Sequence, residues 1–216
     1  MPAHERKERE RANRHRLIVS TARELAETQG WDAVTTRRLA DQIEYSQPVL
    51  YSHFRGKNEI VGAVALEGFA ELAEALRAAV PQGPAGRPVV TALASAYIDF
   101  AARNPALYDA MFILDNGLPF ADEATPAPLR EAFQALLDPL AGHAHPDEPG
   151  LFVETFWSAL HGLVTLTRAG RLPADRAADR LTLLVDRFVP RRIAIAASTR
   201  PGATGPPGTS RPATTA

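Results

Sequence analysis

The chain has 216 residues, of which 45% are hydrophobic and 23% are charged, as is typical of a globular protein that can bury its own core. It contains no cysteine, which excludes disulfides, thiolate metal sites and cysteine nucleophiles, and favours a reducing compartment. The formal net charge of −1 indicates no particular partner. No segment has the pattern of a signal peptide or a membrane span, so we expect a cytoplasmic protein without a membrane partner.

The near-neutral total hides an uneven distribution of charge. Residues 1–57 contain 11 Lys and Arg against 8 Asp and Glu, residues 58–189 contain 9 against 17, and residues 190–216 contain 4 against none. A nucleic-acid contact at the basic end would produce this asymmetry, and an unevenly charged solvated surface would produce it equally well. The basic run 4–16 is either a salt-bridged start of the first helix or an arm that contacts phosphates.

Apolar residues recur with helical period in almost every long segment, and no alternating strand pattern is found, so we predict an all-α protein of about nine helices. The first helix is expected over about 11–29, ended by Gly30. Thr35 is a candidate N-cap for a short helix that ends near Ile43, and Ser46 for a third helix.

The helices that follow are longer and are separated by Pro and Gly. We expect a connecting helix over 58–80 with Lys57 at its start, then a linker over 81–88 and a carboxy-terminal domain over 89–190. The helices of that domain are expected at roughly 89–103, 105–114, 126–140, 147–169 and 174–189. Residues 191–216 are small, polar and rich in Pro and Gly, which predicts a disordered tail.

Residues 35–60 follow the order of a helix-turn-helix unit: helix, short turn, helix, and a basic residue that opens the next helix. The second helix of such a unit places its first turn at the base edges of the major groove. Ser46, Gln47, Pro48 and Val49 occupy that turn, where Gln can pair with adenine and an apolar side chain can contact a thymine methyl. Residues 1–57 are therefore predicted to form a domain that binds double-stranded DNA.

The same stretch resembles the TetR family of transcriptional regulators. The residues on matching positions of the family pattern, in an ungapped register, are Arg37, Leu39, Ala40, Ser46, Leu50, Tyr51, His53, Phe54, Lys57 and Ile60. The resemblance implies contacts to the DNA backbone from Thr35 or Thr36, Tyr51, His53 and Lys57, and contacts to bases from residues 46 to 49. Arg37 adds positive charge around the motif.

Two positions depart from the family pattern. Ile43 and Glu44 stand where Ala-Gly is usual in the turn, and because glutamate lacks the freedom of glycine at positive φ we expect a somewhat altered turn. Pro48 lies deeper in its helix than the prolines common there and should stiffen the turn. Leu50 and Phe54 are expected to be ordinary core residues.

Aromatic residues concentrate in the carboxy-terminal domain, where we expect a small-molecule pocket and a dimer interface. Such pockets are mostly apolar, so the expected ligand is a hydrophobic or aromatic compound. The expected lining residues are Tyr97, Phe100, Met111, Phe112, Phe133, Phe156, Trp157 and His161.

Trp157-Ser-Ala-Leu-His161-Gly162 also resembles the Trp-x-x-x-His-Gly signature of a TetR subfamily with a WHG-type carboxy-terminal domain. This resemblance implies a buried Trp and His beside the effector pocket and the dimer helix. A core histidine that bonds a carbonyl is an equally good interpretation of His161.

The last two helices combine a stripe of small residues with an apolar stripe, a pattern that suits a four-helix bundle formed with a second copy. The expected interface residues are Ser158, Gly162, Thr165, Leu181, Leu184, Val185 and Phe188. Two DNA-binding units on one face of the duplex must lie roughly 34 Å apart, which a homodimer would provide.

The favoured function is that of a repressor that occupies a pseudo-palindromic operator. A small molecule would release it by moving the two DNA-binding units away from the spacing of the DNA grooves, and the connecting helix would transmit this change. A constitutive DNA-binding dimer is the alternative. An enzyme is the rival class, because His143 and His145 with Asp147 and Glu148 could bind a metal. An H-x-H pair in a Pro-rich loop is more often solvated, so we expect no enzyme activity, metal or cofactor.

Overall fold

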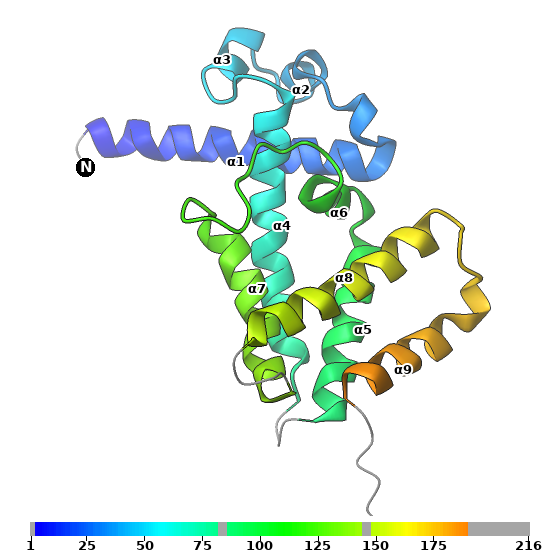
Figure 1. The fold of residues 1–216 in the computed structure, drawn as a ribbon. Coiled ribbons are helices and arrows are strands. Elements are labelled where there is room, and N and C mark those ends of the chain that lie inside the picture. The colour runs from blue at the N-terminus through cyan, green and yellow to red at the C-terminus, as the bar shows by residue number, and fades with distance from the viewer. Residues whose placement is uncertain (1–2, 82–85, 144–147, 190–216) are drawn as a thin grey trace, which may run out of the picture.

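The computed structural model describes residues 3–81, 86–143 and 148–189, and the path of the chain is shown in Figure 1. These residues form nine α-helices and three short 3-10 segments, with no strand among them, which confirms the all-α prediction. The expected tail and part of the expected linker lie outside the described residues. Every described helix is too short or too polar to cross a bilayer.

One end of the molecule, called the head below, is made of α1 (Ala3–Gln29), α2 (Thr36–Gln42) and α3 (Gln47–Tyr51). Helix α1 starts well before the predicted residue 11, because its charged turns are paired at i,i+4 spacing, as in the ion pair of Arg14 with Glu10. Its exposed amino-terminal half projects beyond the rest of the head (Figure 1). Its other half packs apolar residues into the core.

Helix α4 (Lys57–Ala79) runs from the head through the length of the molecule, close to the predicted range (Figure 1). Its glycines allow two close approaches. A Cβ on Gly62 would lie 2.6 Å from the carbonyl oxygen of Asn116, and one on Gly68 would lie 2.7 Å from the Sδ atom of Met111. Helix α4 therefore packs tightly against α6 and against the loop that follows α6.

The rest of the chain, called the body, contains α5 (Arg87–Arg103), α6 (Pro105–Phe112), α7 (Ala127–Leu140), α8 (Pro149–Arg168) and α9 (Ala177–Phe188). Helices α5 and α7 lie along α4, α8 crosses over both, and α9 lies beside α5 (Figure 1). The short helix α6 is the part of the body that contacts α1 of the head, and it also contacts α4. Helix α6 therefore connects the head to the rest of the body through its contacts.

Candidate DNA-binding and effector sites

The turn between α2 and α3 has the hydrogen bonds of a Schellman motif, with Glu44 as its left-handed residue. The backbone of Glu44 has φ 58°. The N–H of Tyr45 donates to the carbonyl oxygen of Ala40 at 2.9 Å, and the N–H of Glu44 donates to the carbonyl oxygen of Asp41 at 3.4 Å. Glutamate thus adopts the conformation usually given to glycine, and the expected alteration of the turn does not occur.

The first turn of α3 is open to solvent. Ser46, Gln47 and Pro48 are exposed, Val49 is half-buried, and Leu50 is buried as predicted. Ser46 is the N-cap residue, but its hydroxyl makes no capping bond and only its carbonyl accepts the N–H of Val49, at 3.0 Å. Pro48 lies within the first turn, where the absence of an N–H costs nothing.

The threonines expected at the DNA backbone have different local roles. The hydroxyl of Thr35 caps α2 by accepting the N–H of Arg38 at 3.2 Å, as the sequence predicted. The Oγ1 atom of Thr36 lies 3.4 Å from the Oη atom of Tyr51, whose side chain is 52% exposed. Arg37 is exposed on the same helix as Thr36. Helices α2 and α3 thus present hydroxyl and guanidinium donors to solvent together.

His53 follows α3 and lies beside the projecting part of α1. Its ring centre is 6.3 Å from that of His15, which in turn stacks on Phe54 at 4.6 Å. Burial, and after it the positive charge of Arg11, lowers the pKa of His53, so its imidazole is neutral at pH 7 and keeps one N–H to donate. The same interaction shows that basic residues of α1 lie next to the loop after α3.

Lys57 opens α4, as predicted, but its ammonium is directed at the protein. The Nζ atom donates to the carbonyl oxygen of Trp31 in the 3-10 segment η1 (Trp31–Ala33). An ammonium has three N–H donors, so this bond leaves two for another acceptor. Lys57 therefore fixes the start of α4 against η1, a role that the sequence did not suggest.

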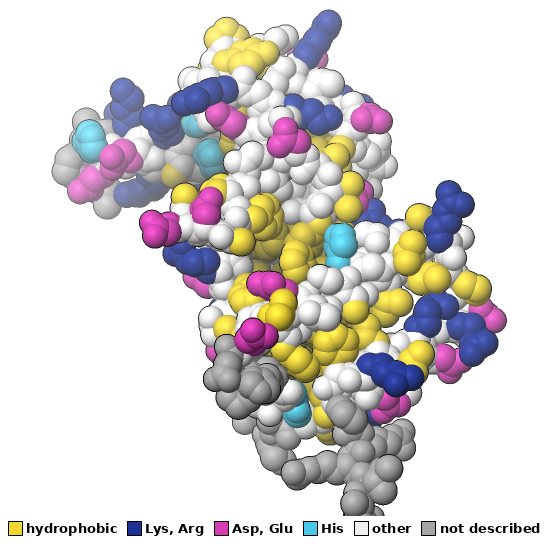
Figure 2. Space-filling model, viewed as in Figure 1, with side chains coloured by type: hydrophobic (Ala, Val, Ile, Leu, Met, Phe, Trp, Pro, Cys, Tyr) yellow, Lys and Arg dark blue, Asp and Glu magenta, His cyan; other side chains and the backbone are white. Residues whose placement is uncertain are grey.

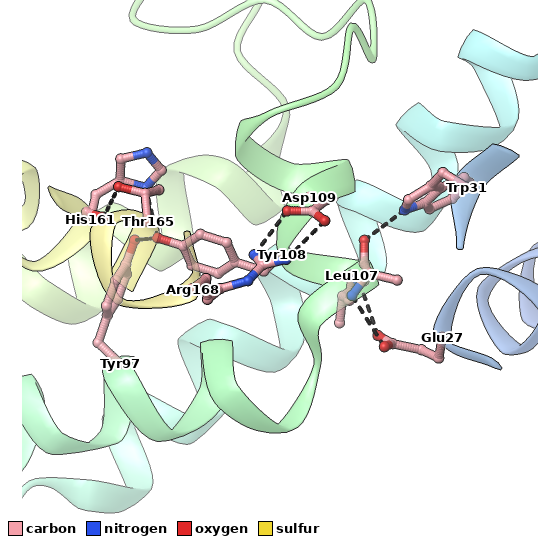
Figure 3. A network of polar contacts seen from close by, with 10 residues as sticks. Glu27, Trp31, Tyr97, Leu107, Tyr108, Asp109, His161, Thr165 and Arg168 are labelled. Atoms are coloured by element: carbon pink, nitrogen blue, oxygen red, sulfur yellow. Dashed lines mark hydrogen bonds and ion pairs between the residues drawn. The ribbon is translucent and has the colours of Figure 1, made fainter. Parts of the chain in front are cut away.

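The first turn of α6 is capped from α1. The carboxylate of Glu27 accepts the N–H groups of Ala106 and Leu107 at 3.1 and 3.0 Å, and the indole of Trp31 donates to the carbonyl of Ala106 at 2.7 Å. Asn104, the N-cap residue of α6, makes no side-chain capping bond of its own. Figure 3 shows Glu27 and Trp31 converging on this turn. We call this set of bonds the α6 clamp.

A chain of four side chains links α8, α5 and α6 inside the body. Trp157 Nε1 donates to Tyr97 Oη at 2.9 Å. Tyr97 Oη lies 2.8 Å from Tyr108 Oη, which lies 2.7 Å from His161 Nδ1 (Figure 3). An indole nitrogen can only donate a hydrogen bond, so Tyr97 accepts from Trp157. Each hydroxyl proton then has an acceptor if Tyr97 donates to Tyr108 and Tyr108 donates to His161. In that arrangement Nδ1 of His161 accepts and the ring is neutral.

The titration behaviour of the chain agrees with this direction. Burial lowers the pKa of His161, which favours the neutral imidazole. Burial also raises the pKa of Tyr97 to about 12 and raises that of Tyr108, so both phenols keep their protons. Above Tyr108 lies the guanidinium of Arg168, 5.7 Å from the ring centre, and it forms a bidentate ion pair with Asp109.

Of the residues expected to line an effector pocket, Tyr97, Trp157 and His161 belong to this hydrogen-bonded chain, and the ring of Phe112 packs against Tyr108, Trp157 and His161. Tyr97, Phe100, Met111 and Phe156 are buried, and the half-buried ones are Phe112, Phe133, Trp157 and His161. Full burial of Trp157 and His161 was expected and is not observed. His161 bonds a tyrosine hydroxyl, which neither interpretation of this residue had specified.

The residues expected at a dimer interface fall into two groups. The small residues Ser158, Gly162 and Thr165 line a face of α8 where a Cβ on Gly162 would meet nothing within 4 Å, so this face is turned away from the rest of the chain. On α9, Leu181, Leu184 and Phe188 keep part of their surface. Val185 is 1% exposed and lies in the core of its own chain.

The rival metal motif falls partly outside the described residues. His143 ends the short segment after α7, whereas His145 and Asp147 are not described. In the parts of the chain that the structure describes, no His, Asp and Glu side chains come together in a group that could hold a metal ion.

Two family models match the chain. The model for bacterial regulatory proteins of the tetR family matches residues 18–64, and a tetracycline-repressor-like carboxy-terminal domain matches residues 90–188. The first range covers the α2–α3 unit and the start of α4, and the second covers almost the whole body.

Relatives of known sequence or structure agree. A helix-turn-helix regulator of Mycobacterium tuberculosis is 29% identical over 71% of this chain and 69% of its own length. One of Bacillus subtilis is 31% identical over 45% of this chain, and the match spans about half (51%) of that relative. A protein of unknown function from Rhodococcus has a TM-score of 0.65 at 25% identity, over 81% of this chain and 92% of its own. The chain belongs to the TetR family of DNA-binding transcriptional regulators.

Proposed function

We propose that the protein is a dimeric repressor that occupies a pseudo-palindromic operator and leaves it when a hydrophobic or aromatic small molecule binds to the body. The observation that carries the proposal is the open first turn of α3, where Ser46, Gln47 and Pro48 face solvent with no capping or packing role for their side chains. We also propose membership of the WHG-type subfamily, because Trp157 and His161 lie at the two ends of one hydrogen-bonded chain.

In the proposed complex the head divides its contacts between bases and phosphates. Gln47 would pair with an adenine edge, and Pro48 and Val49 would meet thymine methyl groups. The neutral imidazole of His53 and the hydroxyls of Thr36 and Tyr51 would donate to phosphates. Arg11 and Arg14 of α1, whose charges act on His53, would add phosphate contacts in this complex, although residues 4–16 also form the salt-bridged start of α1.

Dimerisation would use the outward faces of α8 and α9. Leu151, Leu166 and Leu183 are 56%, 46% and 57% exposed, and apolar side chains gathered on the surface of two helices are typical of a protein–protein interface. They accompany the small-residue stripe around Gly162, which permits another helix to approach closely. A second copy would cover these faces and place two α3 helices on one side of the DNA.

Release of the operator would pass through the α6 clamp as well as α4. A compound that displaces α6 would pull on Glu27 and Trp31 in the head, because both bond the first turn of that helix. A preference of a few kcal/mol for the displaced arrangement is sufficient to empty the operator. The α6 clamp supports coupling of the body to the head.

The alternative is a constitutive DNA-binding dimer whose body serves only dimerisation or protein contact. The burial of Tyr97, Met111 and Phe156, which leaves these side chains with no exposed surface, favours it. This alternative would be supported if no small molecule changed the affinity of the protein for its operator.

Selection of bound sequences from a random double-stranded DNA library tests DNA recognition by the full chain. We expect an inverted repeat with A·T pairs at the positions that Gln47 faces, and relaxed selection there for Gln47→Ala, with a loss of about 1–3 kcal/mol for the selected site. Gln134→Ala, an exposed glutamine of α7, is the matched control and should select the wild-type repeat. Failure to enrich any sequence would overturn the proposal.

A further inference from the structure

A groove lies between α5, α8 and α9, beside the turn that joins the last two helices. Apolar side chains form most of its walls: Ile98 and Ala102 from α5, Leu163 and Val164 from α8, and Ala177 from the start of α9. None of the residues that the sequence predicted for an effector pocket lines this groove. It is therefore a distinct surface of the body.

Two guanidinium groups stand in the apolar walls of the groove. Arg180 of α9 donates from Nη2 to the carbonyl of Pro173 at 2.5 Å, which engages one of the five N–H donors of its side chain. Arg168 of α8 binds both carboxylate oxygens of Asp109, at 2.8 and 2.9 Å. The lining thus offers guanidinium donors, and no acidic side chain belongs to it.

The charged side chains that line the groove, Arg168 and Arg180, are both basic, although Asp109 pairs with the first of them, whereas the body as a whole is acidic. Residues 168–180 contain four Arg against two Asp, whereas residues 58–189 contain 9 Lys and Arg against 17 Asp and Glu. Figure 2 shows basic side chains gathered on this side of the body, next to exposed hydrophobic ones. A basic site in an acidic domain attracts anions and an apolar wall favours hydrocarbon, so the occupant must combine both properties.

We propose that this groove binds an organic carboxylate with an apolar body, a small amphipathic anion such as an alkanoate. The carboxylate would accept bonds from Arg180, because guanidinium and carboxylate match in planar geometry. The hydrocarbon would lie against Ile98, Leu163 and Val164, where it would displace water from apolar surface.

The ion pair of Arg168 connects the groove to the head. Its partner Asp109 lies on α6, close along the helix to Ala106 and Leu107, which Glu27 caps. An anion in the groove competes with Asp109 for Arg168 and weakens the bond that holds α6 to α8. This step rests on the proposed function and identifies the class of effector for it. By linkage, operator DNA should weaken anion binding by the same factor.

Calorimetric titration of the full-length protein with octanoate tests the site without DNA. We expect saturable binding with one octanoate per chain, and binding at least about tenfold weaker for octan-1-ol and octylamine, which lack the negative charge. Arg180→Met should weaken octanoate binding about 10- to 100-fold. Arg171→Met, in the same turn but outside the groove, is the matched control and should bind octanoate as the wild type does.

A second variant fills the groove without touching charge. Ala102→Phe should abolish octanoate binding while its circular dichroism and thermal midpoint stay close to those of the wild type, since Ala102 is exposed. Three results would overturn the proposal. Octanoate and octan-1-ol could bind equally well, or Arg180→Met and Arg171→Met could have equal effects. The third is the absence of octanoate binding by a protein that sedimentation shows to be associated, because a second copy would then cover the groove.

Operator titrations separate this inference from the proposed function. We expect octanoate to release the selected operator from the wild type and not from Arg180→Met. Octanoate binding by a protein that selects no DNA would refute the proposed function and leave the site intact. Release of the operator by other compounds, with no octanoate binding, would refute the site alone.

Discussion

Glu44 holds a left-handed backbone conformation, φ 58°, that costs a residue with a side chain about 1–2 kcal/mol. The Schellman bonds of Ala40 and Asp41 at the end of α2 keep it there. The sequence identified this position as unusual, but predicted that the turn would change. The hydrogen bonds of the helix end outweigh the local preference of glutamate, so the turn keeps its geometry and the residue carries the strain.

Glu44→Gly should therefore raise the free energy of unfolding by about 0.5–1 kcal/mol, because glycine adopts positive φ without strain but gains freedom in the unfolded chain. Glu24→Gly, the same substitution inside α1, should instead lower it by about 1 kcal/mol. Urea unfolding measures both. A loss of stability in Glu44→Gly would show that the turn carries no strain.

The burial of His161 gives the stability of the protein a pH dependence with a definite sign. Burial lowers the folded pKa of His161 below the unfolded value near 6.5, so the unfolded chain binds the proton first. Stability should fall as the pH drops below about 7, until the folded pKa is passed. Protonated Nδ1 would also reverse the bond from Tyr108 and leave a buried tyrosine proton without an acceptor.

Chemical unfolding between pH 8 and 5 measures this effect. The variant His161→Asn serves as the comparison, because the amide oxygen of asparagine can accept a hydrogen bond from Tyr108 and the amide does not titrate. His15 and His53 also have lowered pKa values and remain in both proteins, so they contribute equally. The loss of stability on acidification should be smaller in His161→Asn. Identical curves would contradict the neutral state of His161.

At the scale of elements, periodicity and capping signals predicted most of the helices. The break at Asn104 and Pro105 separates α5 from α6 as expected, and Thr35 caps α2. The early start of α1 was missed because ion pairs, and not apolar period, support its first turns. The α6 clamp could not be predicted, since Glu27 and Ala106 are 79 residues apart and nothing local marks them as partners.

The clamp predicts a specific weakness. Glu27→Ala leaves two N–H groups of α6 without their acceptor, which should cost about 1–3 kcal/mol of stability. Glu27→Gln keeps one acceptor oxygen and should cost less. Glu24→Ala, on the exposed face of the same helix, should change stability by less than about 0.5 kcal/mol. Thermal unfolding measures all three, and equal midpoints for Glu27→Ala and Glu24→Ala would show that the clamp contributes nothing.

At the scale of the whole molecule, the uneven charge along the sequence corresponds to an uneven charge in space. The basic first 57 residues form the head and the acidic residues lie mainly in the body, so the body should repel DNA that the head attracts. The basic patch at residues 168–180 was invisible in this sum, because it lies within the acidic segment. Only the fold brings two of its arginines, Arg168 and Arg180, to the side of an apolar groove.

The proposed dimer would bury the exposed leucines of α8 and α9. Leu183→Glu should shift the protein toward monomer, because a buried charge in the proposed bundle would have no partner. Ile113→Glu, which alters a side chain of similar exposure at the end of α6, is the control and should leave the association unchanged. Sedimentation velocity distinguishes the two, and a wild-type monomer at all concentrations would remove the basis of the operator model.

The spacing of half-sites tests the central claim, that two copies of this chain present their α3 helices to one face of an operator. Fluorescence anisotropy would compare the selected operator with a version that carries about five extra base pairs between its half-sites, which turns them by half a helical repeat. The dimer should bind the altered DNA with an affinity close to that for unrelated DNA, about a thousandfold weaker or more. Equal affinity for both sequences would contradict the claim.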